Sequence, residues 1–148
     1  MFVSVTRLSI RSLRFVRPFQ RENAGIVRQI VGAAGFLAGR LLVETPFTYW
    51  TMTGWDDESA MQAFVRSDAH RAAMPRIQDW SDEATYTHWR QDSRTLPDWR
   101  TAAWRLATAP HPFRLRQPSR DHVRGHIKPL RSAVLSRPLV PVASGKVV

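Results

Sequence analysis

Residues 47–55, with the sequence FTYWTMTGW, restrict the fold of this chain more than any other segment. Aromatic and β-branched side chains dominate the segment, and both kinds are enriched in β-strands. A second strand is expected at residues 36–44, and Thr45 and Pro46 between the two segments are a turn signal. Because the connection is so short, we expect the two strands to form an antiparallel hairpin.

The patterns on either side of this hairpin complete an alternating order of strands and helices. Residues 2–8 alternate with the period of a strand, whereas residues 13–34 carry an apolar stripe with helical spacing. The expected order is a strand at 2–8, a helix at 13–34, strands at 36–44 and 47–55, a helical region at 58–80, a strand at 85–91 and a helix at 97–108. This α+β order, βαββαβ plus a C-terminal helix, is the ferredoxin-like pattern.

The helical region after the hairpin is expected to be interrupted. Ser67 and Asp68 are residue types that begin helices, so we expect a break there. Pro75 lacks the N–H of an interior helical residue, so we expect the second segment to end or kink near Met74.

A sheet that carries helices on one face leaves its other face uncovered. Such a face needs a partner, and a second copy of the chain is the simplest one. The sequence therefore predicts a homodimer of a domain that spans residues 1–108.

Most of the net positive charge lies after this domain. The chain carries a formal net charge of +10, and residues 109–148 hold eight basic residues but only one acidic residue, Asp121. The prolines and scattered arginines of residues 109–148 predict a poorly ordered basic tail. It lacks interleaved aromatic residues and any recognised nucleic-acid motif, so we do not expect nucleic acid as a partner.

Composition excludes several classes of site. The chain has no cysteine, which excludes disulfides, thiolate metal sites and cysteine nucleophiles. We find neither a signal-peptide pattern nor an apolar run long enough to span a membrane. A cytoplasmic location is therefore expected.

Three segments carry a resemblance to a known family: GFLAGRLL (35–42), YWTMTGWDDESAMQAFVRSDAHRAAM (49–74) and YTHW (86–89). Together they resemble the antibiotic biosynthesis monooxygenase superfamily of dimeric α/β barrels. The likeness is greatest to small bacterial proteins related to spheroidene monooxygenase. The resemblance implies a homodimer whose sheets face one another, with a pocket between each sheet and its helices.

Members of this superfamily differ in their chemistry. Some oxidise electron-rich aromatic compounds without metal or flavin, and others bind haem. The resemblance therefore implies a monooxygenase-like oxidoreductase that acts on an apolar aromatic or polyene molecule, with no cofactor or with haem. A haem-binding protein and a non-enzymatic, dimeric ligand-binding module are the alternatives.

The resemblance also points to individual residues. Haem-degrading members use an asparagine on the first strand, a tryptophan that closes the third strand and a histidine on the following helix. Their positions correspond to Thr6, Trp55 and Met74 of this chain, and His70 lies one helical turn before Met74. Methionine and histidine can both ligate haem iron.

The residues themselves leave their roles open. His70 is a candidate acid, base or ligand, but it lies off the centre of the helix face if Met61 and Phe64 point inward. Trp55, which shares a strand face with Tyr49, is either a pocket wall or core.

Four side chains are candidates for substrate binding: Thr6, Tyr49, Arg40 and His88. Arg40 interrupts an apolar strand, where it either anchors an acidic group or emerges at an edge. His88, in the middle of a strand, either contacts the substrate or belongs to an interface.

Overall fold

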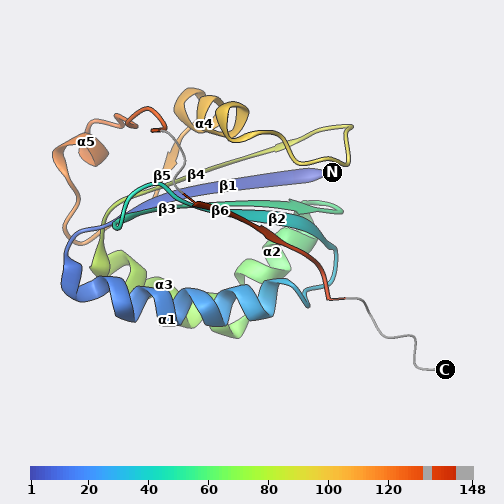
Figure 1. The fold of residues 1–148 in the computed structure, drawn as a ribbon, viewed down its shortest axis with the longest axis horizontal. Coiled ribbons are helices and arrows are strands. Elements are labelled where there is room, and N and C mark those ends of the chain that lie inside the picture. Colours follow the sequence, from blue (N-terminus) through green and yellow to red (C-terminus); the bar gives the residue numbers. More distant parts are fainter. Residues whose placement is uncertain (132–134, 143–148) are drawn as a thin grey trace.

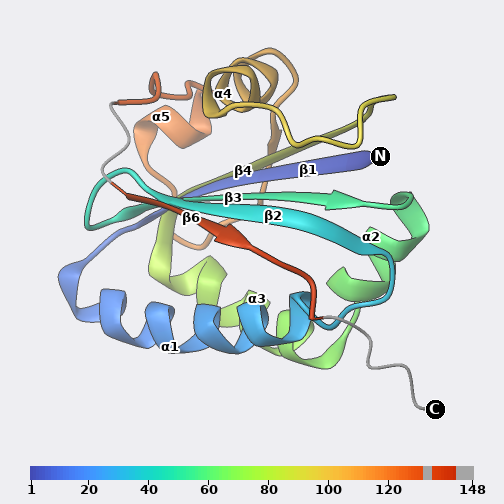
Figure 2. The same ribbon diagram turned by 45° about the vertical axis from the view of Figure 1, so that its right-hand side comes forward.

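A computed structural model of the chain describes residues 1–131 and 135–142. The strands are β1 (Phe2–Ile10), β2 (Phe36–Val43), β3 (Thr48–Trp55), β4 (Ser81–Arg90), β5 (His111–Pro112) and β6 (Leu135–Leu139). The helices are α1 (Leu13–Ile30), α2 (Glu58–Val65), α3 (Asp68–Trp80), α4 (Trp99–Thr108) and α5 (Arg120–Val123). The strands form one sheet in the order β5-β4-β1-β3-β2-β6, with α1 and α3 on one side of it and α4 and α5 on the other (Figures 1 and 2).

The four central strands confirm the predicted α+β, ferredoxin-like fold. Strands β4, β1, β3 and β2 are neighbours in that order, and each pair is antiparallel. The predicted hairpin joins β2 to β3, and β1 lies between β3 and β4. Because strand side chains alternate, this arrangement sends every second residue of β1 and β3 toward α1 and α3.

The predicted break between two helices is present, but its cause is not a simple cap. Helix α2 ends at Val65 and α3 begins at Asp68. The Ser67 hydroxyl donates to the carbonyl of Phe64 and accepts a 2.6 Å hydrogen bond from the side chain of Gln29 on α1. Ser67 therefore ties the junction of α2 and α3 to α1.

The prediction that Pro75 ends or kinks the helix near Met74 is wrong for the helix end, because α3 continues to Trp80. Pro75 lies on the exposed side of α3, where water can satisfy the carbonyl left without a donor. Ile77, in the next turn, is only 8% exposed and anchors the continuation against the core.

The sheet face that was expected to be bare is covered by the chain itself. Ala102 and Leu106 of α4 are fully buried, and they pack with the side chains that β1, β2 and β3 send to this face. Those side chains are Val3, Val5, Leu42, Trp50 and Met52. The uncovered face that predicted a second copy is therefore absent from this part of the sheet.

Two short stretches of the segment expected to be a poorly ordered tail instead join the sheet. Strand β5 pairs with β4, and β6 pairs with the free edge of β2 from Val43 to Gly39. Leu139 of β6 is only 6% exposed. An unpaired strand edge supplies backbone hydrogen-bonding groups that a proline-containing segment can still use, which charge and composition do not reveal. Residues 132–134 and 143–148, including Lys146, lie outside the described residues.

Within the described ranges, no helix is both long enough and apolar enough to cross a membrane.

Candidate active site

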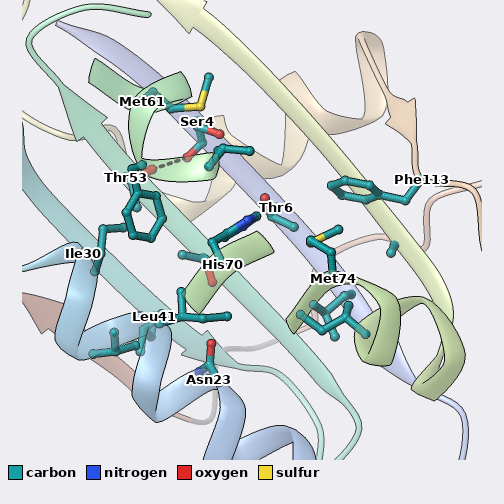
Figure 3. A pocket seen from close by; sticks show the side chains of 18 of the residues that line it. Ser4, Thr6, Asn23, Ile30, Leu41, Thr53, Met61, His70, Met74 and Phe113 are labelled. Carbon is teal, nitrogen blue, oxygen red and sulfur yellow. Dashed lines mark hydrogen bonds between the residues drawn. The ribbon is translucent and has the colours of Figure 1, made fainter. Parts of the chain in front are cut away.

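A cavity of about 130 Å³ lies between the sheet and the helices α1, α2 and α3. Figure 3 shows its lining side chains from close by. Most of them are apolar, and its described lining includes no Lys, Arg, Asp or Glu side chain. A cavity of this composition suits an apolar, uncharged group, with a few polar atoms to orient it.

The floor of the cavity is a ladder of hydroxyl groups from the two central strands. Thr6 of β1 pairs with Thr51 of β3, and Ser4 pairs with Thr53, so the four side chains lie on one face of the sheet. A threonine at the position where the resemblance implied asparagine thus still places a polar group in the cavity. A hydroxyl donates one hydrogen bond and can accept two, whereas the side-chain amide of asparagine can donate two hydrogen bonds.

Trp55 is both cavity wall and core. It lines the cavity and is only 1% exposed, and its indole Nε1 donates a 2.9 Å hydrogen bond to Thr53 Oγ1. Its ring lies 5.4 Å from the rings of both Phe36 and Phe64. This arrangement fixes the indole, so its role toward a ligand is that of a rigid aromatic surface.

His70 points into the cavity, toward Thr6 (Figure 3). The break at Ser67 resets the helical phase and brings His70, Ala73 and Met74 inward, so the off-centre position expected for a continuous phase does not apply. Burial lowers the pKa of the imidazole below its ordinary value, while the backbone of Val65 opposes the shift. The Nδ1 atom is buried and makes no well-aligned hydrogen bond in the described part of the chain, although the backbone of Val65 is close enough to act on the ring. A neutral imidazole that faces the cavity can act as a base.

Met74 also lines the cavity, one turn from His70, so the two atoms able to ligate haem iron are on the same side. The inner cavity by itself does not fit haem, because it holds about 130 Å³ and its described lining offers no cation to receive a propionate. One arginine, Arg137, lines the space next to it. Elsewhere in the described ranges, no group of three or more His, Asp or Glu side chains could hold a metal ion.

A second cavity, of about 340 Å³, adjoins the first and shares several of its walls. Tyr49 lines this outer cavity, where its hydroxyl donates a 2.9 Å hydrogen bond to the carbonyl of Pro46. Burial raises the pKa of Tyr49, although the side chain of Gln20 opposes the shift. Tyr49 therefore stays a neutral phenol at the outer end of the site.

Asn23 is a polar lining residue that the sequence analysis did not single out. It lies on α1 and lines both cavities, and its side chain points toward Leu41 (Figure 3). The available signal was its place in the apolar stripe: Phe19, Ile26, Val27 and Ile30 line the same cavity from α1. A polar residue inside such a stripe faces the interior, and this one meets a ligand space.

The structure does not bring Arg40 or His88 into the cavity. Arg40 pairs with Met52, whose side chain lies on the α4 side of the sheet. His88 pairs with Ser4 but belongs to an aromatic cluster outside the cavity, with ring centroids 5.8 Å from Tyr86 and 5.7 Å from His111. Both predictions of a substrate-binding role are therefore unsupported by the geometry.

A comparison with protein families identifies a family that the chain matches. The sequence profile of the family described as "Antibiotic biosynthesis monooxygenase" matches residues 1–76, more than half of the chain.

The chain belongs to the antibiotic biosynthesis monooxygenase family.

Solved structures support the same fold for this family member. SnoaB, a cofactor-independent oxygenase from Streptomyces nogalater, is 17% identical, with a TM-score of 0.53 over 66% of this chain and 97% of SnoaB. A putative antibiotic biosynthesis monooxygenase from Nitrosomonas europaea is 12% identical, with a TM-score of 0.57 over 63% of this chain and all of the other. No curated protein matches the chain in sequence.

The family match covers most of the candidate site. Thr6, Asn23, Trp55, His70 and Met74 all lie within residues 1–76, whereas α4, β5, α5 and β6 lie beyond them. The finer likeness to the spheroidene monooxygenase group stays a prediction.

Proposed function

We propose that this family member is a monooxygenase that oxidises an apolar, electron-rich aromatic molecule in the two adjoining cavities, with His70 as the general base. The observation that carries the proposal is the imidazole of His70, which lines the cavity, points toward Thr6 and has its pKa lowered by burial. Trp55 contributes a fixed aromatic wall, and Thr6 lies on the floor toward which His70 points.

The chemistry begins with proton removal. A neutral imidazole accepts a proton from a phenol or from a CH₂ group activated by adjoining rings, and the resulting carbanion or phenolate is a far better electron donor to O₂. Conversion of such a CH₂ group to a carbonyl uses one O₂. One oxygen atom enters the product, and the other leaves as water with the two substrate hydrogens. The substrate supplies all four electrons that reduce O₂, so the step needs no separate reductant.

This chemistry favours an aromatic substrate over a polyene. A polyene hydrocarbon has no comparably acidic proton for His70 to remove, so the position of the imidazole would serve no purpose. The apolar lining accepts either class. The homodimer predicted for this chain stays part of the proposal, and sedimentation velocity of the purified protein measures it.

Oxygen uptake with hydroquinones, with a tricyclic anthrone and with a carotenoid tests the function. We expect consumption of O₂ with the anthrone and a loss of about 10²-fold or more in His70→Gln, since general-base catalysis is worth about 10²–10⁴-fold. His88→Gln is the matched control, because His88 lies outside the cavity. Uptake that stays at the level of buffer with every substrate, or equal activity in His70→Gln, would overturn the proposal.

A further inference from the structure

A groove of about 580 Å³ lies on the opposite side of the sheet from the cavity, between α4 and residues 127–131. Trp50 of β3 contributes to the groove, whereas the next residue, Thr51, lines the cavity. The two spaces are therefore separated by the sheet itself.

One face of α4 forms the first wall. Its residues recur at helical spacing: Arg100, Ala103, Trp104 and Ala107. The two alanines leave the space open, and the larger residues flank it. Trp104 is 59% exposed, which is unusual for a side chain of this size, and the guanidinium of Arg105 lies 5.4 Å from its ring.

The opposite wall is held in place by buried carboxylates. Glu44 accepts a 2.8 Å hydrogen bond from the backbone N–H of Arg131 and another of 2.8 Å from the indole of Trp50. Lys128 is bound at 3.1 Å to Glu83, which is itself paired with buried Arg7. The groove is thus preformed, and a ligand would not have to order it.

The charge of the groove is one-sided. Arg100, Lys128 and Arg131 line it, and its described lining contains no acidic side chain. Lys128 is neutralised by Glu83 and Asp121, but the guanidinium groups of Arg100 and Arg131 have no ion-pair partner within residues 1–131 and 135–142. Two uncommitted guanidinium groups beside an exposed indole suit a carboxylate that is attached to an aromatic ring.

We propose that this groove is a second ligand site, which binds a small aromatic carboxylate. The ring stacks on Trp104 above Ala103 and Ala107, and the carboxylate pairs with Arg100 and Arg131. The site is independent of the oxidation proposed for the cavity, since no residue lines both the cavity and the groove. Trp50, in the intervening sheet, borders both the groove and the outer cavity.

The test uses the full chain labelled with 5-fluorotryptophan, with Trp104→Phe to assign one fluorine resonance. Titration with 2-naphthoate is expected to shift the Trp104 resonance while that of Trp55, in the cavity, stays in place. Arg131→Gln should weaken binding about tenfold, as expected for loss of a charge-assisted hydrogen bond. Ala107→Leu, which keeps every charge and the helix propensity, should block binding by filling the groove.

Arg124→Gln is the matched control, because Arg124 is an exposed arginine that does not line the groove. Equal weakening in Arg124→Gln would show general attraction to a basic surface and overturn the proposal. The proposal is also overturned if neutral 2-naphthamide binds as tightly as 2-naphthoate, or if Ala107→Leu binds 2-naphthoate as tightly as the parent does. A Trp104 resonance that does not move during the titration would also contradict the proposal. The same result is expected if a second copy of the chain covers the groove.

Discussion

The rings of Phe64 and His70 meet edge to face, with centroids 5.5 Å apart and planes at 64°. Phe64 lies in the last turn of α2 and His70 in the first turn of α3, so this contact sets the direction of the imidazole across the break between the two helices. Phe64 also lies 5.4 Å from Trp55. One buried ring thereby positions both residues to which the proposed oxidation assigns a role.

Acidification should destabilise the fold through His70. Burial lowers the pKa of His70 in the folded chain, so the unfolded chain binds its proton at a higher pH, near the ordinary value of about 6.5. The free energy of unfolding therefore falls as the pH drops from that value through the lowered folded pKa. Urea denaturation at a series of pH values measures this slope. His70→Gln should lose less stability on acidification than the parent. Parallel pH profiles for parent and His70→Gln would mean that the imidazole is not buried as described.

Replacement of Asn23 by leucine should weaken substrate binding. The substitution keeps the size of the side chain but removes the amide from the wall shared by the two cavities. One neutral hydrogen bond contributes about 1 kcal/mol, so KM should rise about fivefold. Steady-state kinetics with the anthrone measures it, and Arg21→Leu on the exposed side of α1 is the control. A KM unchanged by Asn23→Leu would remove the amide from the binding site.

Truncation of Leu139 tests whether β6 closes the cavity. Leu139 is 6% exposed, lines the cavity and packs against Gly39, where an added Cβ would lie 3.2 Å from the leucine side chain. Leu139→Ala should lower the free energy of unfolding by roughly 2 kcal/mol, because buried methyl groups are lost and a void remains. Val140→Ala should change it little, since Val140 is 70% exposed. Chemical denaturation compares the two. Equal stability of both variants would show that β6 does not dock in solution.

Hemin should not form a defined complex with the chain. The cavity beside His70 and Met74 holds about 130 Å³, and the described linings of the two adjoining cavities together offer one cation, Arg137, for two propionates. Titration with hemin at micromolar concentration is expected to give no sharp Soret band. A sharp band that moves in His70→Ala or Met74→Ala would replace the cofactor-free proposal with the haem-binding alternative.

The central fold was predictable because its signals are local. The alternation in residues 47–55, the apolar stripe of α1 and the break at Ser67 each act within a few residues, and together they specify βαββαβ. The family resemblance pointed to the same segments, and the profile match over residues 1–76 confirmed it.

The remaining features depended on contacts between distant parts of the chain. Strands β5 and β6 form because β4 and β2 offer free edges, and no pattern inside a short proline-containing segment reveals such a partner. Arg40 lies outside the cavity. The alternation along a strand shows which residues share a face, but only the packed structure shows which of the two faces lines the cavity.

For the site, the sequence by itself determined which residues were available, including His70 and Trp55, and the order of the elements that carry them. Only the tertiary structure decided that His70 points inward and that Asn23 joins it. The physical reason is that the orientation of α3 follows from its hydrogen bonds and packing against α1 and Phe64, which lie far away or across a helix break in the sequence.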